Sequence, residues 1–196
     1  MREAVLDNGI RVVTERRPDV RSVAVGVWIA QGSAHETPES GGVSHLMEHL
    51  VFKGTGRRTA HEIALSLESL GGSLDAYTTR EHTSYQAHVL DEHLPVALDV
   101  LADLVLHPRL DASDLELEKD VVIEEIAGVE DTPDDMVFDL HGAKFWNGHA
   151  YGQPILGTRE TVRAFEIDDF RSLHSERCQS AREAQECSRN VTQCFL

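Results

Sequence analysis

The sequence predicts an α+β fold, in which helices pack on a mainly antiparallel sheet. Two observations support this prediction. Segments with the alternating, valine-rich pattern of strands fall in pairs that are separated by short turns, as in β-hairpins. Longer segments with helical periodicity and helix-capping residues lie between and after these pairs, without the regular strand–helix alternation of a parallel sheet. With 196 residues, the chain is long enough for one core or, at most, two small domains.

The expected strands are short and are bounded by turn residues. Asn8-Gly9 favours a hairpin turn, because both residues tolerate positive φ, and it joins a short N-terminal strand to the next strand. A second hairpin turns at Arg80-Glu81. After the N-terminal strand, the expected strands are residues 10–16, 22–33, 73–80 and 82–90.

The expected helices have recognisable ends. Thr59 and Glu62 form a capping box, in which each side chain bonds to the backbone N–H of the other residue. Ser113 begins an acidic helix by the same pattern, and Pro108 ends the apolar helix before it. The longer expected helices are residues 40–53, 59–70, 92–107, 113–131 and 133–146, and two short helical pieces follow them.

The charge and composition exclude several classes of function. The formal net charge of −16 repels phosphate backbones, so we expect no nucleic-acid partner. The same charge attracts cationic peptides or simply keeps the chain soluble. No apolar run is long enough to span a bilayer, and the N-terminus lacks the apolar core of a secretory signal. We therefore expect a cytoplasmic protein that has no membrane partner.

The segment HLMEH places His45 and His49 four residues apart, with Glu48 directly before the second histidine. On a helix, residues at i and i+4 lie one above the other, so these imidazoles can bind one metal ion. A helical wheel places the apolar residues of this helix opposite the histidines. The alternative is a pair of exposed histidines on an ordinary amphipathic helix. A catalytic zinc also needs a third protein ligand.

Candidates for the third ligand come from the acidic helix. On its wheel, Glu118 and Glu125 fall within an arc of apolar side chains, and Glu124 lies at the edge of that arc. The apolar residues of the arc are Leu117, Val121, Val122 and Val129. A buried carboxylate is unfavourable unless it is paired or binds a metal, so the wheel favours these two glutamates. The alternative is that the helix is only half-buried and that both carboxylates are solvated.

Several motifs together resemble one known family. HLMEH is the inverted zinc-binding motif HxxEH. Four segments occur in the order found in the M16 metallopeptidases: GGVSHLMEHLVFKGT, GGSLDAYTTREHTSY, EKDVVIEEI and YGQPILGT. This family includes pitrilysin, insulin-degrading enzyme and the β-subunit of the mitochondrial processing peptidase. The chain resembles the N-terminal half of these proteins, most of all the bacterial processing-peptidase-like branch, which implies a zinc-binding catalytic domain over residues 1–176.

The resemblance implies a role for each matching residue in a zinc-dependent metalloendopeptidase, which hydrolyses peptide bonds in peptides or small unfolded proteins. His45, His49 and Glu125 are the expected zinc ligands. Glu48 is the expected general base that acts on a zinc-bound water. Glu118 matches an auxiliary catalytic glutamate of the family, and we interpret it as a partner of a histidine ligand.

The same resemblance implies a binding site for peptide substrates. Members of the family hold an extended substrate against the edge of a sheet, where it adds as a further β-strand. Here the matching segment is Leu74, Asp75, Ala76 and Tyr77.

The chain also departs from the family pattern. Family members of this type carry two homologous halves, so the resemblance implies a second half-domain or a partner chain that completes the site. The pattern stops after Glu176, where relatives continue into another strand, and all the cysteines follow this point. We expect residues 177–196 to form an aberrant tail, either disordered or translated in a shifted reading frame.

Two alternative functions belong to other classes. The first is a truncated, non-catalytic half-enzyme that acts only as a peptide-binding or interaction fragment. The second is an S-ribosylhomocysteine lyase, since these small enzymes share the inverted motif. They need a catalytic cysteine in the body of the domain, whereas the cysteines here are Cys178, Cys187 and Cys194. The lyase is therefore the weaker alternative.

Overall fold

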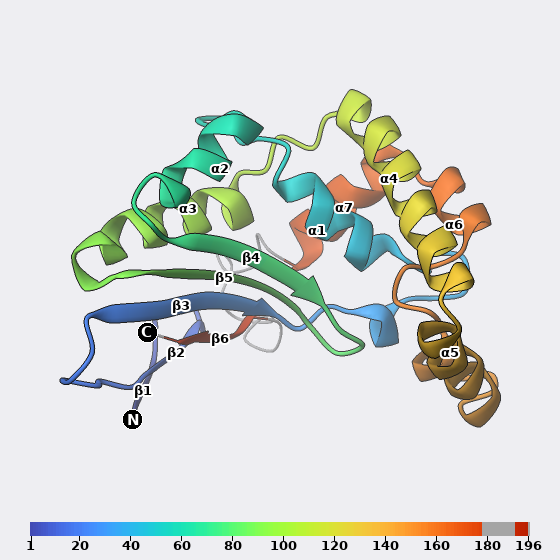
Figure 1. Ribbon diagram of the computed structural model, residues 1–196, viewed down its shortest axis with the longest axis horizontal. Coiled ribbons are helices and arrows are strands. Elements are labelled where there is room, and N and C mark those ends of the chain that lie inside the picture. The colour runs from blue at the N-terminus through green and yellow to red at the C-terminus, as the bar shows by residue number, and fades with distance from the viewer. Residues whose placement is uncertain (178–190, 196) are drawn as a thin grey trace.

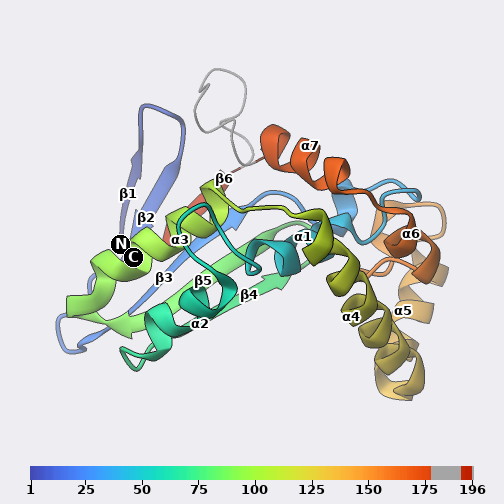
Figure 2. The same cartoon turned by 90° about the horizontal axis from the view of Figure 1, so that it is seen from above.

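The computed structural model describes residues 1–177 and 191–195. Its centre is a six-stranded sheet, and helices cover one face of that sheet (Figures 1 and 2). The strands are β1 (Arg2–Val5), β2 (Arg11–Thr14), β3 (Ser22–Ile29), β4 (Ser73–Thr78), β5 (Thr83–Leu90) and β6 (Val191–Phe195). The longer helices are α1 (Val43–Val51), α2 (Ala60–Glu68), α3 (Leu94–Leu106), α4 (Ala112–Asp131), α5 (Pro133–Phe145), α6 (Arg159–Ala164) and α7 (Ile167–Arg177). The α+β class predicted from the sequence is confirmed.

The sheet has the strand order β1-β2-β6-β3-β5-β4. Both predicted hairpins are present, because β1 pairs with β2 and β4 pairs with β5, each in antiparallel fashion. β3 pairs antiparallel with β5, and the pair β2–β6 is parallel. β4 is therefore an edge strand, and it lies next to the end of α1 in space (Figure 1).

The hydrophobic core lies between the sheet and the helices α1, α2 and α3. Alternation along β5 explains one side of it, since Tyr85, Ala87 and Val89 are buried while His88 and Leu90 are exposed. The opposite side comes from helix residues that are almost completely buried. These include Leu46 and Leu50 of α1, Ile63 and Leu67 of α2, and Leu101 and Leu104 of α3.

Two helix starts differ from the sequence prediction. α1 begins at Val43 rather than near Ser40, because Gly42 before it has a left-handed φ of 94°. α4 begins at Ala112, and its N-cap is Asp111 rather than Ser113. The Asp111 carboxylate accepts a hydrogen bond from the Ser113 backbone N–H at 2.9 Å, which satisfies a donor of the first turn. The capping box predicted at Thr59 and Glu62 is confirmed.

A buried ionic cluster fixes the loop between α1 and α2. Asp103 of α3 is buried and accepts hydrogen bonds from Thr55 Oγ1 at 2.7 Å, Arg57 Nε at 2.9 Å and Arg58 Nη1 at 2.5 Å. Burial opposes ionisation of this carboxyl, but the hydrogen bonds and guanidinium charges outweigh it and hold the pKa of Asp103 below its usual value. The loop that follows the histidine helix is thereby attached to the helical layer.

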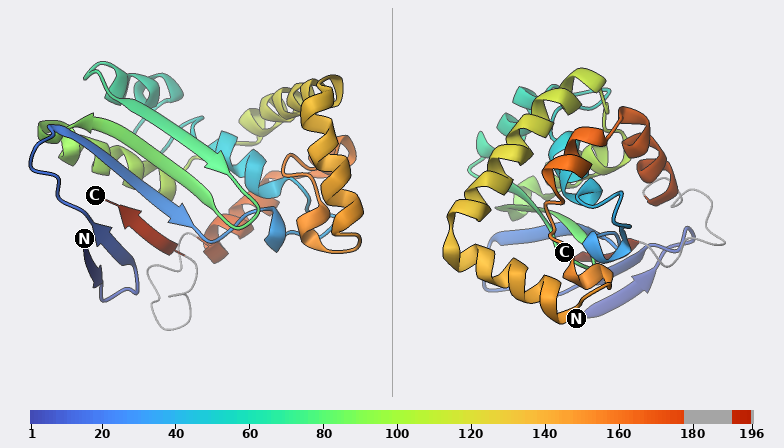
Figure 3. Two further views of the ribbon diagram at one scale, coloured as in Figure 1. Left: turned by 60° about the horizontal axis from the view of Figure 1, so that its bottom comes forward. Right: turned by 90° about the vertical axis from the view of Figure 1, so that its right-hand side faces the viewer.

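The segment expected to be an aberrant tail lies mostly outside the described residues, namely residues 178–190 and 196. Within it, Val191–Phe195 forms β6 between β2 and β3, where we expected no regular structure (Figure 3). This segment forms a strand because its backbone pairs with both β2 and β3, whose facing edges would otherwise have unpaired N–H and C=O groups. The division into a domain of residues 1–176 and a separate tail stays a prediction.

No helix in the described part of the chain combines the length and the apolar character that crossing a membrane requires.

Candidate metal centre

α1 presents the two histidines on the side opposite the core, as its sequence predicts. Leu46, Leu50 and Val51 are almost fully buried, whereas the side chains of His45 and His49 are 12% and 17% exposed. The two imidazole rings lie one turn apart, with their centroids separated by 4.7 Å. One helix face thus packs in the core while the other carries both nitrogen donors.

The beginning of α1 is held by contacts that the sequence analysis did not anticipate. The buried carboxylate of Glu36 accepts hydrogen bonds from the backbone N–H groups of Gly42 and Ser44, both at 2.8 Å. A negative charge at a helix N-terminus is favourable, because the first N–H groups lack partners within the helix. The available signal was Glu36 itself, an acidic residue a few positions before the predicted helix.

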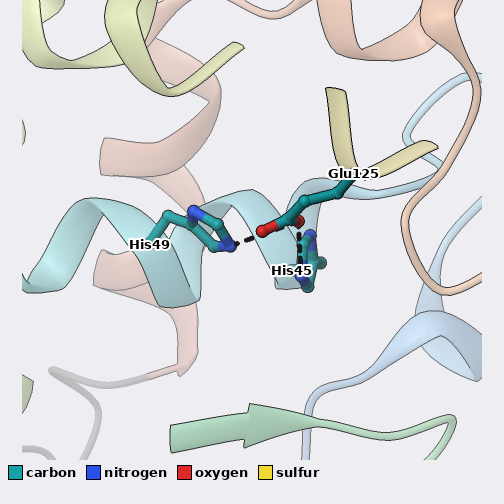
Figure 4. A group of neighbouring side chains, drawn as sticks. All are labelled: His45, His49 and Glu125. Atoms are coloured by element: carbon teal, nitrogen blue, oxygen red, sulfur yellow. Dashed lines mark ion pairs between the residues drawn. The ribbon is translucent and has the colours of Figure 1, made fainter. Parts of the chain in front are cut away.

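α4 brings a carboxylate to the two imidazoles. One oxygen of Glu125, Oε2, lies 3.6 Å from His45 Nε2 and 3.7 Å from His49 Nε2. Figure 4 shows this carboxylate reaching from α4 toward both rings. The side-chain donor atoms of the three residues lie within 4.8 Å of one another. The structure therefore brings together the three residues that the sequence analysis selected as zinc ligands.

Glu118, two turns before Glu125 on α4, contacts the far side of one imidazole. Its Oε2 lies 3.0 Å from His49 Nδ1, and its Oε1 lies 2.6 Å from Lys53 Nζ. The wheel placed Glu118 correctly, since its side chain is only 7% exposed. It misplaced the apolar arc, because Leu117 and Val121 are exposed and Glu125 lies at the rim of the buried face, with its side chain 41% exposed.

Glu48 lies between the histidines and the sheet. Its Oε2 accepts a hydrogen bond of 2.6 Å from Thr78 Oγ1, at the end of β4. Burial raises the pKa of Glu48, the Thr78 hydrogen bond and His49 lower it, and the nearby charge of Glu125 raises it, with a net increase. Thr78 is a site residue that the sequence analysis missed. The alternation of β4 could have indicated it, because every second residue of a strand lies on the same face, and Thr78 shares its face with the partly buried Leu74 and Ala76.

The four residues proposed to bind substrate lie on β4, beside this group. Leu74 and Ala76 point toward the helical layer and pack against the core, while Asp75 and Tyr77 are exposed on the other face. Their backbones pair with β5 on one side, and β4 ends the sheet on the other side. An extended peptide can pair with such an open edge.

The residues fit a zinc ion by their chemistry and their spacing. Two histidines and one carboxylate form a donor set typical of catalytic zinc, with a position left for a fourth ligand. Two ligands about 2.1 Å from one tetrahedral ion lie roughly 3.4 Å apart. The measured separations of 3.6 and 3.7 Å are close to this and are longer than hydrogen bonds. Burial, followed by the charge of His49, lowers the pKa of His45 to about 4, which favours the neutral imidazole that binds metals.

Two curated relatives are similar to most of this chain. An uncharacterized zinc protease of Bacillus subtilis, YmxG, is 47% identical over 189 residues, which are 96% of this chain and 46% of the relative. The β-subunit of the mitochondrial processing peptidase from Lentinula edodes is 39% identical over 170 residues, 86% of this chain and 36% of the relative. The chain thus spans less than half of the length of these relatives.

Solved structures show the same fold. A protease from Helicobacter pylori matches 99% of this chain with a TM-score of 0.90 and 23% identity, and the match covers 45% of that protein. Pitrilysin matches 98% of this chain with a TM-score of 0.82 and 21% identity, over 20% of its own length. The sequence model of the insulinase family, peptidase family M16, matches residues 11–159. The chain therefore belongs to the M16 family of peptidases.

Proposed function

We propose that the chain is the zinc-binding catalytic part of a metalloendopeptidase, which hydrolyses peptide bonds in peptides or small unfolded proteins. The observation that supports this most strongly is the meeting of His45 and His49 with Glu125 from a separate helix. The relatives named as zinc proteases support the choice of metal. In this proposal His45, His49 and Glu125 hold the ion through two neutral imidazoles and one carboxylate.

The residues around the ligands have complementary tasks. Zinc held by these three residues would supply a Lewis acid, which would polarise the substrate carbonyl and lower the pKa of water at the site toward about 7. Glu48 accepts a proton from the attacking water and passes it to the leaving amine. The raised pKa of Glu48 suits both tasks, because such a carboxyl binds and releases protons closer to neutral pH. Glu118 accepts a hydrogen bond from His49 Nδ1–H and so leaves the Nε2 lone pair free to bind the ion, on the side of the ring that faces Glu125.

The substrate binds in extended form along β4. Backbone groups of Leu74 to Tyr77 on the open edge pair with the peptide. The next residue of β4, Thr78, is hydrogen-bonded to Glu48, so a peptide on this edge brings its scissile bond near Glu48. The formal net charge of −16 favours peptides with positive charge.

The relatives are more than twice as long as this chain, which supports a second proposal about partners. We infer that a second half-domain or a partner chain completes the substrate-binding site in the active protein. The competing function is a non-catalytic half that binds peptides without cleaving them. The short coverage of the relatives favours this competitor for the chain taken alone.

One experiment separates the two functions. The wild-type chain and Glu48→Gln are compared for bound zinc, for binding of a quenched fluorescent peptide and for cleavage of that peptide. We expect both proteins to bind zinc and only the wild type to cleave. Cleavage that is unchanged in Glu48→Gln would rule out the proposed mechanism. Zinc and peptide binding without cleavage by the wild type would establish the non-catalytic half instead.

A further inference from the structure

Lys53 makes a contact that the proposed mechanism does not use. It lies two residues after the end of α1, and its backbone is fixed at both ends: its N–H donates to Leu50 O at 3.1 Å, and its carbonyl accepts from Arg109 Nη2 at 3.2 Å. From this fixed point its side chain reaches Glu118 Oε1 at 2.6 Å. Lys53, Glu118 and His49 therefore form a continuous chain of polar contacts, which ends on a proposed zinc ligand.

The two oxygens of Glu118 have different partners. Oε2 contacts His49 Nδ1 at 3.0 Å, and Oε1 contacts Lys53 Nζ at 2.6 Å. This carboxylate is almost fully buried and needs both partners, because a buried charge without compensation is strongly unfavourable. Without the ammonium group, the carboxylate would be able to rotate about its last bond and share its oxygens differently.

The other histidine has no such partner in the part of the chain that the structure describes. The Nδ1 atom of His45 is buried and has no hydrogen-bond partner among the described residues. Within the described part of the chain, a side chain therefore holds Nδ1 of His49, and none holds Nδ1 of His45. The orientation of the His49 ring therefore depends on the carboxylate of Glu118 and on the groups that hold this carboxylate in place.

We propose that Lys53 is a positioning residue for the zinc site, and that it acts through Glu118 on His49. Its ammonium group holds Glu118 Oε1, so that Oε2 faces His49 and accepts from Nδ1–H. This arrangement keeps the His49 Nε2 lone pair directed at the point shared with His45 and Glu125. The charges agree with this role, because Lys53 and a divalent cation together balance the carboxylates of Glu48, Glu118 and Glu125. The inference rests on the proposed function only for the identity of the metal.

The test measures metal affinity rather than activity. Zinc affinity is determined by competition with a chromophoric chelator for the wild type, Lys53→Met and Lys53→Arg. We expect Lys53→Met to bind zinc about tenfold more weakly, since partners of metal-bound histidines contribute roughly 10- to 100-fold. Lys53→Arg should bind nearly as the wild type does, because it keeps the positive charge. Cobalt loaded into the same proteins should show a changed visible spectrum in Lys53→Met alone.

Lys119→Met is the matched control. Lys119 lies on α4 next to Glu118, but its ammonium group pairs with the exposed Glu116 at 2.7 Å. This variant removes a lysine–glutamate pair of similar length, and its zinc affinity should equal that of the wild type. Circular dichroism of each variant confirms that the chain remains folded.

The Glu118→Gln background shows whether Lys53 acts through Glu118. We expect Lys53→Met to cause no further loss of affinity there. Wild-type affinity in Lys53→Met, or the same loss with and without Glu118, would overturn the inference. A wild type that binds no zinc would overturn both this inference and the proposed function. Zinc binding that depends on Lys53, without peptide cleavage by this chain, would favour the non-catalytic half and leave the positioning role established.

Discussion

Single residues at the site are tuned by burial and by their immediate partners. His45 is kept neutral because burial and the charge of His49 lower its pKa to about 4. Glu48 experiences opposing effects, since burial and Glu125 raise its pKa while Thr78 and His49 lower it. The pKa of the proposed metal ligand His45 is therefore lowered while that of the proposed proton acceptor Glu48 is raised, although both residues lie on α1.

Thr78→Val is expected to lower catalysis without affecting metal binding. The hydroxyl of Thr78 donates a 2.6 Å hydrogen bond to Glu48, and valine has nearly the same shape but no donor. A hydrogen bond to a charged group contributes about 1.5–3 kcal/mol, so kcat for a quenched peptide should fall at least roughly tenfold. Thr78→Ser keeps the hydroxyl and should retain most of the activity. Equal kcat for the valine variant and the wild type would show that Thr78 does not orient Glu48.

At this scale the sequence predicted the histidine pair but missed Thr78. The spacing of His45 and His49 is a local property of one helix, which periodicity reveals directly. The contact between Glu48 and Thr78 joins α1 to the end of β4, and it depends on how the helix lies across the sheet. Alternation predicts the face of the strand that carries Thr78, but it does not predict the helix residue that faces it.

The position of α1 as an element depends on a close approach between two glycine-containing segments. Gly157 has a φ of 75°, and a Cβ atom placed there would lie 2.2 Å from Gly41 O. A Cβ atom on Gly42 would lie 2.6 Å from Leu156 O. Both neighbours are backbone atoms, which cannot move aside without displacing the start of the histidine helix. This contact joins the GGVSHLMEH segment to the YGQPILGT segment.

Gly157→Ala should therefore destabilise the fold and weaken zinc binding. Gly148→Ala is the control, because Gly148 also has a positive φ, of 77°, but an added Cβ would meet nothing within 4 Å. Gly148→Ala should lower the free energy of unfolding, measured in denaturant, by only the conformational strain of about 1–2 kcal/mol. Gly157→Ala should cost more and should also lower the zinc affinity. If both variants lose the same stability and keep the same affinity, the close packing does not position α1.

The acidic helix α4 shows the limit of a helical wheel. The wheel found that Glu118 and Glu125 lie on one side, but it placed that side among Leu117 and Val121, which are exposed. The buried residues of α4 are instead Leu115, Glu118, Lys119, Val122 and Ile126. A wheel averages the apolar residues of one helix, whereas the buried face is set by the neighbouring helices, here α1 and α6.

The contact between α3 and α7 should make stability depend on pH. His174 of α7 is buried, with Nε2 2.8 Å from the carbonyl oxygen of Val105, and burial lowers its pKa below the ordinary 6.5. Below that pH the unfolded chain binds a proton that the folded chain does not, so stability falls as the pH falls. The slope is at most about 1.4 kcal/mol per pH unit. In urea unfolding between pH 7.5 and 5.5, the wild type should lose more stability than His174→Gln, and equal losses would contradict this assignment.

At the scale of the whole molecule, the sheet and the helical layer meet at the site. α1 lies between the edge strand β4 and the acidic helix α4, so the site joins both layers of the fold (Figures 1 and 2). The hairpins were predictable because their turns and alternation are local. The position of β6 between β2 and β3 was not predictable, because a C-terminal strand there pairs with two strands from the N-terminal part of the chain.

Zinc should stabilise the whole folded chain. An ion that binds only the folded state at 100 times its Kd adds about 2.7 kcal/mol, which corresponds to a Tm increase of roughly 5–10 °C for a domain of this size. Calorimetry of the chain in EDTA and then in excess zinc measures this difference. His45→Ala should show little response to zinc, since it lacks one ligand. A wild-type Tm that is the same in both conditions would mean that the folded chain does not bind the ion tightly.

The most direct test of the account is the metal content of Glu125→Gln and Glu124→Gln, each compared with the wild type. The two glutamates are neighbours on α4, but only Glu125 reaches both imidazoles, and Glu124 is exposed. After dialysis against trace zinc, mass spectrometry should find about one zinc per chain in the wild type and in Glu124→Gln, and far less in Glu125→Gln. Full zinc content in Glu125→Gln would show that this carboxylate and the two histidines do not form the metal site.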